Sequence, residues 1–168
     1  DDHDERFFSG RFRRCGMQIF SSFCPAEEGA KVRGGVITAI PLHRPWLQED
    51  SADVVVEGRI QAVRAPLKKW GVLNVHLHAG SEDGPKIAQL MALRDYLAGD
   101  KGYFWAVGGD WNLPSDKWDH FRQGKNGEPG TWVGPSEGLA AAVGQVLAAG
   151  GLGDVTYAYH SHVPRGDN

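Results

Sequence analysis

Short apolar runs alternate with glycine and proline along most of the chain, without a repeat period. Three runs rich in β-branched residues predict strands: residues 36–40, 52–56 and 59–65. Pro41 ends the first run, and Pro66 with Lys68 and Lys69 predicts a turn after the third. The pattern therefore favours short strands joined by turns.

Residues 71–78 alternate between apolar and polar positions, as expected of a half-buried strand. Side chains on a strand point to opposite faces in turn, so this segment divides into two sets. One face carries Leu73, Val75 and Leu77, and the other carries Asn74, His76 and His78. The second face presents groups able to do chemistry.

Two segments have helical spacing. Residues 86–98 place Ile87, Leu90, Met91, Arg94 and Leu97 on one side, with Pro85 suited to the first turn and Gly99 to the end. Residues 139–149 place Leu139, Val143, Val146 and Leu147 on one side and stop at Gly150 and Gly151. Between them, the almost wholly apolar residues 103–107 predict a buried strand, and residues 115–137 a long surface loop.

Size and composition indicate one domain over residues 1–168, because 41% of the 168 residues are hydrophobic and 23% are charged. A strand, a long helix and a further strand favour a mixed sheet covered by helices. Cys15 and Cys24 are expected to be plain thiols, since their spacing fits neither a zinc knuckle nor a redox pair. Plain thiols in turn favour an intracellular setting. The acidic amino terminus and the lack of a long apolar stretch predict no membrane insertion.

The net charge of −3 argues against holding nucleic acid by bulk electrostatics, so a polyanion would need a local basic patch. Two clusters are candidates, although such clusters are more often solvated surface. They consist of Arg6, Arg11, Arg13 and Arg14, and of Arg64, Lys68 and Lys69.

Asp110 and Asn112 follow the apolar segment 103–107, after two glycines that permit a sharp turn. A carboxylate at a strand end can bind a divalent cation or take a proton from water, and an amide can orient that water. The alternative for this Gly-Asp-x-Asn sequence is an Asx turn that caps the following segment.

The pair His76 and His78 is also compatible with zinc, because an H-x-H pair on one strand is a common zinc-ligand arrangement. A metallo-β-lactamase-like site would need an Asp at the position of Gly80, and an amidohydrolase barrel would need a longer chain. His78 is otherwise a surface or hydrogen-bonded strand histidine.

Asn74-Val75-His76-Leu77, a helix containing Gln89, and then Gly109-Asp110-Trp111-Asn112 occur in that order. This combination resembles the endonuclease/exonuclease/phosphatase superfamily, whose G-G-V strand is similar to Gly34-Gly35-Val36. Residues 147–160 are similar to its later helix and G-L-x-D segment. The resemblance implies a DNase-like α/β sandwich of two packed mixed sheets with outer helices, incomplete at both ends.

The family resemblance also implies roles for single residues: Asp110 would position or deprotonate the attacking water. Asn112 would orient that water and, with Asp110, help hold Mg²⁺ or Mn²⁺. His76 would contact the scissile phosphate, and Asn74 would support the strand end. The implied reaction is in-line attack on a phosphodiester, with donors and the metal stabilising charge on the phosphoryl oxygens.

Two family motifs have no counterpart. The metal-binding Glu of an L-Q-E strand is missing before Gly34, since Leu47-Gln48-Glu49 comes after it and is treated as coincidence. The final S-D-H strand is missing too, and His160 and His162 stand in the wrong place to replace its His. The sequence thus looks like the middle of a larger domain, and we expect weak or no nuclease activity from these residues alone.

The leading hypothesis is a nuclease domain of the retroelement or deadenylase kind. Fold cannot decide between DNA, RNA, phospholipid and inositol phosphate substrates. Four aromatic residues near the motif could stack on bases, or pack as a lid: Trp111, Trp118, Phe121 and Trp132. The alternatives are an inactive remnant or nucleic-acid-binding module of the same fold, and a His-based zinc hydrolase.

Overall fold

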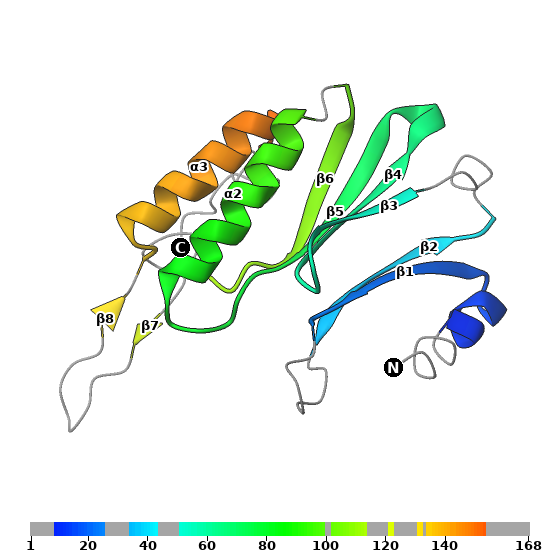
Figure 1. Ribbon diagram of the computed structural model, residues 1–168, viewed down its shortest axis with the longest axis horizontal. Coiled ribbons are helices and arrows are strands. Elements are labelled where there is room, and N and C mark those ends of the chain that lie inside the picture. The colour runs from blue at the N-terminus through cyan, green and yellow to red at the C-terminus, as the bar shows by residue number, and fades with distance from the viewer. Residues whose placement is uncertain are drawn as a thin grey trace, which may run out of the picture.

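The structure, a computed structural model, describes residues 9–25, 34–43, 51–99, 102–113, 121–122, 131–132 and 134–153. Its strands are β1 (Met17–Phe23), β2 (Gly35–Pro41), β3 (Ser51–Val56), β4 (Ile60–Ala65), β5 (Trp70–His76), β6 (Phe104–Asp110), β7 (Phe121–Arg122) and β8 (Thr131–Trp132). Its longer helices are α2 (Asp83–Gly99) and α3 (Glu137–Gly150). Figure 1 shows three layers, with α2 and α3 on one face of the central sheet and β1 and β2 on the other.

The central sheet is mixed and has the strand order β3-β4-β5-β6. Antiparallel pairing joins β3 to β4 and β4 to β5, whereas β5 and β6 run parallel because α2 forms the crossover between them. A 3₁₀ turn, Pro66–Lys68, connects β4 to β5. The strands, the turn and the mixed sheet predicted from the sequence are therefore confirmed.

The prediction that residues 103–107 form a buried strand is wrong. β6 is the last strand of the described sheet; its first four residues alternate between exposed and half-buried, and its last three are exposed. β2 packs against β4 and β5 and leaves this face of β6 uncovered, so Phe104 is 81% exposed. An apolar run here marks an edge strand with one bare face.

β1 and β2 form an antiparallel pair that packs on the central sheet through a partly polar layer. The buried residues of this layer include Ser22, Val36, Thr38 and Gln61. Ser22 Oγ accepts the N–H of Gly58, in the turn between β3 and β4, at 2.9 Å. The end of β1 is thereby fixed beside the β3–β4 turn.

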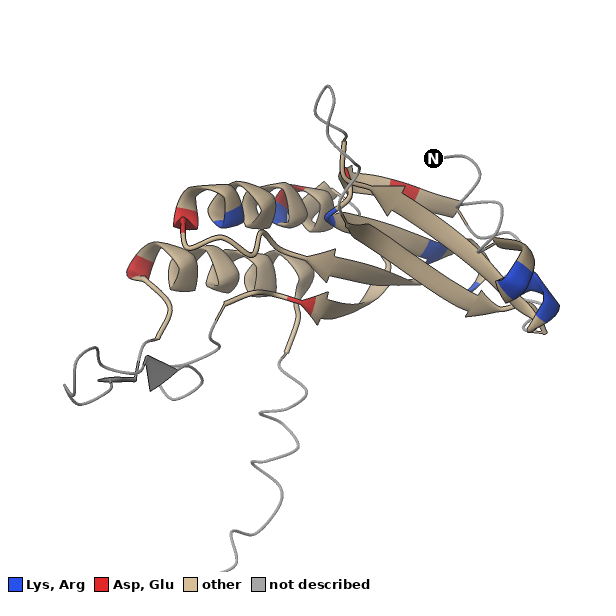
Figure 2. Cartoon of the chain, turned by 90° about the horizontal axis from the view of Figure 1, so that it is seen from below, with Lys and Arg blue, Asp and Glu red and all other residues tan. Residues whose placement is uncertain are grey.

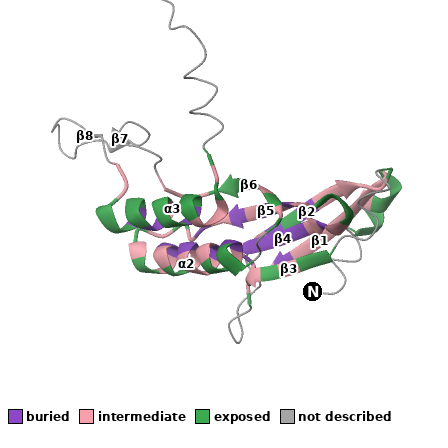
Figure 3. Cartoon of the chain, turned by 90° about the horizontal axis from the view of Figure 1, so that it is seen from above, coloured by how far each residue is buried: buried purple, intermediate pink, exposed green. Residues whose placement is uncertain are grey.

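The hydrophobic core lies between the central sheet and the two helices (Figure 3). Its fully buried members include Ile60, Leu73, Val75, Leu77, Leu90, Leu93 and Val146. The apolar face of β5 thus faces the helices, as its alternation predicted. Each fully buried aliphatic side chain contributes about 1.5–3 kcal/mol through removal from water.

Both helices form where the sequence predicts them. Ser136 caps α3, since its Oγ accepts the N–H of Leu139 at 3.2 Å, and Gly151 ends the helix in the left-handed conformation at φ 59°. The prediction for α3 is wrong in one detail. Leu147, which helical spacing assigns to the apolar face, is exposed, and Ala142 is buried instead.

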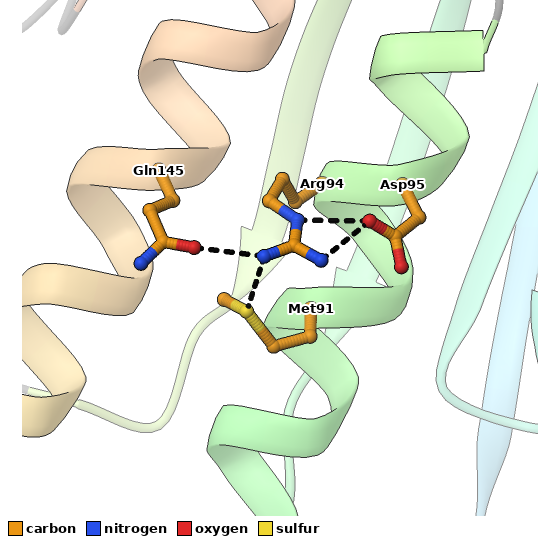
Figure 4. Close-up of polar contacts among 4 residues, drawn as sticks. All are labelled: Met91, Arg94, Asp95 and Gln145. Atoms are coloured by element: carbon orange, nitrogen blue, oxygen red, sulfur yellow. Dashed lines mark hydrogen bonds and ion pairs between the residues drawn. The ribbon is translucent and has the colours of Figure 1, made fainter.

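Arg94 connects the two helices on their outer side (Figure 4). Its Nη1 donates to Gln145 Oε1 of α3 at 2.9 Å and to Met91 Sδ at 3.1 Å, while Nε and Nη2 donate to Asp95 Oδ1 at 2.8 and 2.6 Å. Arg94, which helical spacing groups with the apolar residues of α2, therefore bridges α2 and α3 from a half-exposed position and is not part of the apolar core.

Arg64 is not part of a solvated basic patch, contrary to that interpretation of the sequence. Its guanidinium pairs with Asp53 on β3 and donates from Nε to the Tyr96 hydroxyl of α2 at 3.0 Å. The Tyr96 hydroxyl donates in turn to Asp53 at 2.8 Å, and its ring meets Trp105 edge-on at a centroid distance of 5.7 Å. This cluster ties the sheet to α2.

Several sequence interpretations lie outside the described residues: Arg6, Leu47-Gln48-Glu49, Trp118, most of the loop 115–137, His160 and His162. Within that loop, β7 and β8 form a short antiparallel pair. Cys15 and Cys24 are free thiols, as expected. No helix in the described ranges is long and apolar enough to cross a membrane.

Candidate active site

The ends of β5 and β6 bring the two sequence motifs together. Because these strands run parallel, their carboxyl ends lie at the same end of the sheet, and His76 is the register partner of Asp110. Paired residues on neighbouring strands project to the same face of a sheet. A half-buried imidazole and an exposed carboxylate therefore lie side by side.

Gly109 makes this close pairing possible. Its φ is 134°, and a Cβ there would overlap the carbonyl oxygen of Val75 on β5. Only glycine fits such a backbone approach without strain. Gly108, by contrast, has open space around it. One of the two glycines of the motif is thus a packing requirement.

The Asp110–Asn112 corner is an Asx turn joined to the segment after β5. The N–H of Asn112 donates to Asp110 Oδ1 at 3.0 Å, and Asn112 takes the left-handed conformation with φ 47°. The Asn112 side chain donates from Nδ2 to Leu77 O at 2.8 Å, and the Leu77 N–H donates to Asp110 O at 2.9 Å. The turn weighed as an alternative is present, and it leaves Asp110 Oδ2 outside the Asx hydrogen bond.

Asn74 connects the two sheets. Its Nδ2 donates to Ile37 O at 2.9 Å and to Thr38 Oγ1 at 3.3 Å, both on β2. Asn74 lies on the same face of β5 as His76, but its partner on β6 is Gly108. The contacts seen for this amide are those of a structural link behind the His76–Asp110 pair.

Arg59 is a residue of this edge that sequence patterns did not single out. Its carbonyl oxygen accepts the N–H of His76 at 2.8 Å, one step beyond the Ile60–Val75 pair. Arg59 lies in the turn that leads into β4, and this bond sets its backbone opposite His76, so Arg59, His76 and Asp110 form a row from that turn across β5 to β6. Only the strand register, which the sequence did not predict, could reveal this cation.

His78 lies beyond the end of β5 and is not a strand residue. Its N–H donates to Gln89 Oε1 of α2 at 2.9 Å, and its ring lies against Gly80. His76 and His78 therefore differ in surroundings: His76 is on the strand beside Asp110, and His78 is in the following segment.

Within the described residues, no group of three or more His, Cys, Asp or Glu side chains is placed to hold a metal ion. Mg²⁺ does not require such a cage, since it keeps several waters and binds through one or two carboxylates and substrate phosphates. The exposed Asp110 carboxylate and the Asn112 amide fit that mode of binding.

The described residues of the candidate basic clusters lie at the other end of the sheet from the His76–Asp110 pair. Lys68 and Lys69 precede β5, whereas Asp110 ends β6, and the seven residues of β6 span roughly 20 Å. The helical residues 9–14, with Arg11, Arg13 and Arg14, precede β1, whose far end meets Gly58 (Figure 2). The early basic clusters are therefore remote from the His76–Asp110 pair.

A scan against protein-family models and a search of curated proteins both find no match. Among solved structures, the chain is similar to an AP endonuclease from Archaeoglobus fulgidus, with a TM-score of 0.60 and 21% sequence identity. The similarity covers 92% of this chain and 59% of that chain, so this chain spans less than two thirds of its length. The predicted fold class, a DNase-like α/β architecture, is confirmed.

Proposed function

We propose that the chain is a divalent-metal-dependent phosphodiesterase that acts on nucleic acid as an endonuclease or exonuclease. The observation that supports this most is the register pairing of His76 with Asp110 at the shared end of two parallel strands. The similar structure, an AP endonuclease, supports nucleic acid as the substrate class. Fold alone does not assign an activity, so the proposal depends on these residues.

In the proposed reaction, a water molecule attacks the phosphorus in line with the leaving oxygen. Asp110 accepts a proton from the water as the water oxygen bonds to phosphorus, and the leaving oxygen, once its bond to phosphorus breaks, takes a proton from solvent. His76, beside it in the row, donates a hydrogen bond to a phosphoryl oxygen, and Asn112 orients the water. Asn74 holds the β5 end through its contacts with β2.

Asp110 and Asn112 would hold Mg²⁺ or Mn²⁺, which when bound supplies positive charge against the charge that develops on the phosphoryl group. Arg59 would add a cation at the other end of the row, where its guanidinium would contact a phosphate of the substrate backbone. One carboxylate and one cation then flank the His76 imidazole.

The test is cleavage of fluorescent DNA and RNA oligonucleotides, including one with an AP site, with Mg²⁺, Mn²⁺ or EDTA. Asp110→Asn is the informative variant, because an amide oxygen still accepts the Asn112 N–H but carries no charge. We expect slow metal-dependent cleavage that falls by about 100-fold or more in Asp110→Asn. Equal rates for both proteins, or cleavage unaffected by EDTA, would refute the proposal.

The second candidate is a non-catalytic nucleic-acid-binding module of the same fold. It is favoured by the hydrogen bonds that Asp110 and Asn112 already make within the turn and to Leu77. This candidate predicts oligonucleotide binding that depends on Arg59, with no cleavage above the Asp110→Asn background. Calorimetry with Mg²⁺ separates the two further, because only the enzyme requires a metal site that Asp110→Asn weakens.

A further inference from the structure

We infer that Gln89 of α2 is a positioning residue for the Asp110–Asn112 corner. The inference rests on the proposed function for its catalytic consequence, and on hydrogen bonds for its geometry. Gln89 Oε1 accepts the N–H of His78 at 2.9 Å, across 11 residues of sequence. This bond ties α2 to the segment that follows β5.

The His78 N–H is one residue from the point where that segment meets the corner. Leu77 donates its N–H to Asp110 O at 2.9 Å and accepts Asn112 Nδ2 at 2.8 Å. A continuous set of bonds therefore runs from Gln89 through His78 and Leu77 to both candidate reactive residues. Leu77 is fully buried, which fixes its side chain while these bonds fix its backbone.

α2 is a rigid support for this arrangement. Leu90, next to Gln89, and Leu93 are completely buried in the core, and α2 packs along the length of α3. A glutamine held by a well-packed helix defines the position of its acceptor oxygen better than a loop residue would. Loss of this acceptor frees the His78 N–H and loosens residues 77–79 relative to the helix.

A shift of the corner matters because Asn112 has a left-handed backbone that its own contacts must maintain. A displacement of about 1 Å of reacting groups can cost on the order of 100-fold in rate. Gln89 touches neither substrate nor metal in this scheme, so its loss should lower kcat and leave KM nearly unchanged.

The test compares Gln89→Met, which keeps length but has no oxygen acceptor, with Gln89→Glu, which keeps the acceptor. Gln145→Met is the matched control, because Gln145 also accepts one hydrogen bond from a side chain of α2 but lies on the outer side of the helix pair. We expect kcat to fall about 10- to 100-fold in Gln89→Met, with KM within about twofold. Gln89→Glu should retain most of the rate, and Gln145→Met all of it.

Amide hydrogen exchange at His78, Leu77 and Asn112 gives a second readout that needs no turnover. Gln89→Met should raise exchange at all three amides by about tenfold or more, and Gln89→Glu should restore protection. Exchange that rises at His78 alone, or at none, overturns the inference even if the protein cleaves nucleic acid. Faster exchange at all three amides of Gln89→Met, in a protein that cleaves no nucleic acid, would refute the proposed function but support the positioning role of Gln89.

Discussion

Asn74 on β5 and Thr38 on β2 are joined by a hydrogen bond of 3.3 Å that crosses from one sheet to the other. The same amide donates to Ile37 O at 2.9 Å, so one side chain supplies two links between the layers. The sheets meet through a layer that contains the buried polar residues Ser22, Thr38 and Gln61. Burying a polar group costs free energy unless it is hydrogen-bonded, and the two bonds of Asn74 meet that requirement for its amide.

Removing this link should destabilise the protein. Asn74→Ala leaves the Ile37 carbonyl and the Thr38 hydroxyl without their donor, and we expect the free energy of unfolding to fall by about 1–3 kcal/mol. Urea unfolding followed by circular dichroism measures the change. Thr38→Val, which leaves the Ile37 contact in place, should cost less. Equal stability of Asn74→Ala and wild type would show that the link contributes nothing.

The two glycines before Asp110 should respond differently to substitution. Gly109→Ala places a methyl group onto the Val75 carbonyl at φ 134°, so we expect a loss of about 3 kcal/mol or more, or failure to fold. Gly108→Ala is the matched control, because nothing lies near its added Cβ. Thermal unfolding of both variants tests this. A smaller effect at Gly109 than at Gly108 would contradict the pairing of β5 with β6.

Tyr96 should give the protein an alkaline limit. Burial, and next the hydrogen bond to Asp53, raise the pKa of the Tyr96 phenol above its ordinary value of 10.0. A raised folded-state pKa means that the folded protein holds the proton more tightly, so this stabilisation is complete below pH 10 and is lost as the pH rises beyond it.

Tyr96→Phe therefore should remove part of the fall in stability above pH 10 and lower stability at neutral pH, where the bonds to Arg64 and Asp53 are lost. Urea unfolding from pH 7 to 11 measures both effects. Tyr103→Phe is the control, since Tyr103 packs on Trp105 through its ring. Identical pH profiles for Tyr96→Phe and wild type would refute the role of the phenol.

Arg59 should contribute to nucleic-acid binding in a way that Arg13 does not. Arg59→Ala removes the cation opposite His76, whereas Arg13→Ala removes the same charge from the exposed helical residues before β1. We expect Arg59→Ala to weaken binding about tenfold and to reduce the slope of log K against log salt by about 1. Fluorescence anisotropy at several salt concentrations decides this. Equal losses for both variants would indicate only a bulk charge effect.

Much of the fold follows from local patterns. The alternation over residues 71–78 predicts β5 and the face that enters the core, and helical spacing predicts α2 and α3. The exposure of β6 could not be predicted, because an apolar run such as residues 103–107 is compatible with a central or an edge strand. Position within a sheet depends on tertiary order, which no local pattern contains.

The candidate site divides in the same way. Motifs close to strand ends point to Asp110, Asn112 and His76 as candidates, because they can be recognised from short stretches of sequence. Arg59 was missed because it meets His76 only through the antiparallel register of β4 and β5. The family resemblance singles out Gln89 in the helix, but the proposed role of Gln89 depends on a hydrogen bond between α2 and the chain after β5.

The open side of β6 has a practical consequence for the assays. Among the described residues, β6 pairs with β5 on one side and has no strand partner on the other, and an unpaired strand edge can template strand addition. Phe104, at the start of that strand, is 81% exposed. Self-association through this edge of β6 should increase with protein concentration. The measurements above therefore call for dilute samples, with light scattering to check that the protein is monomeric.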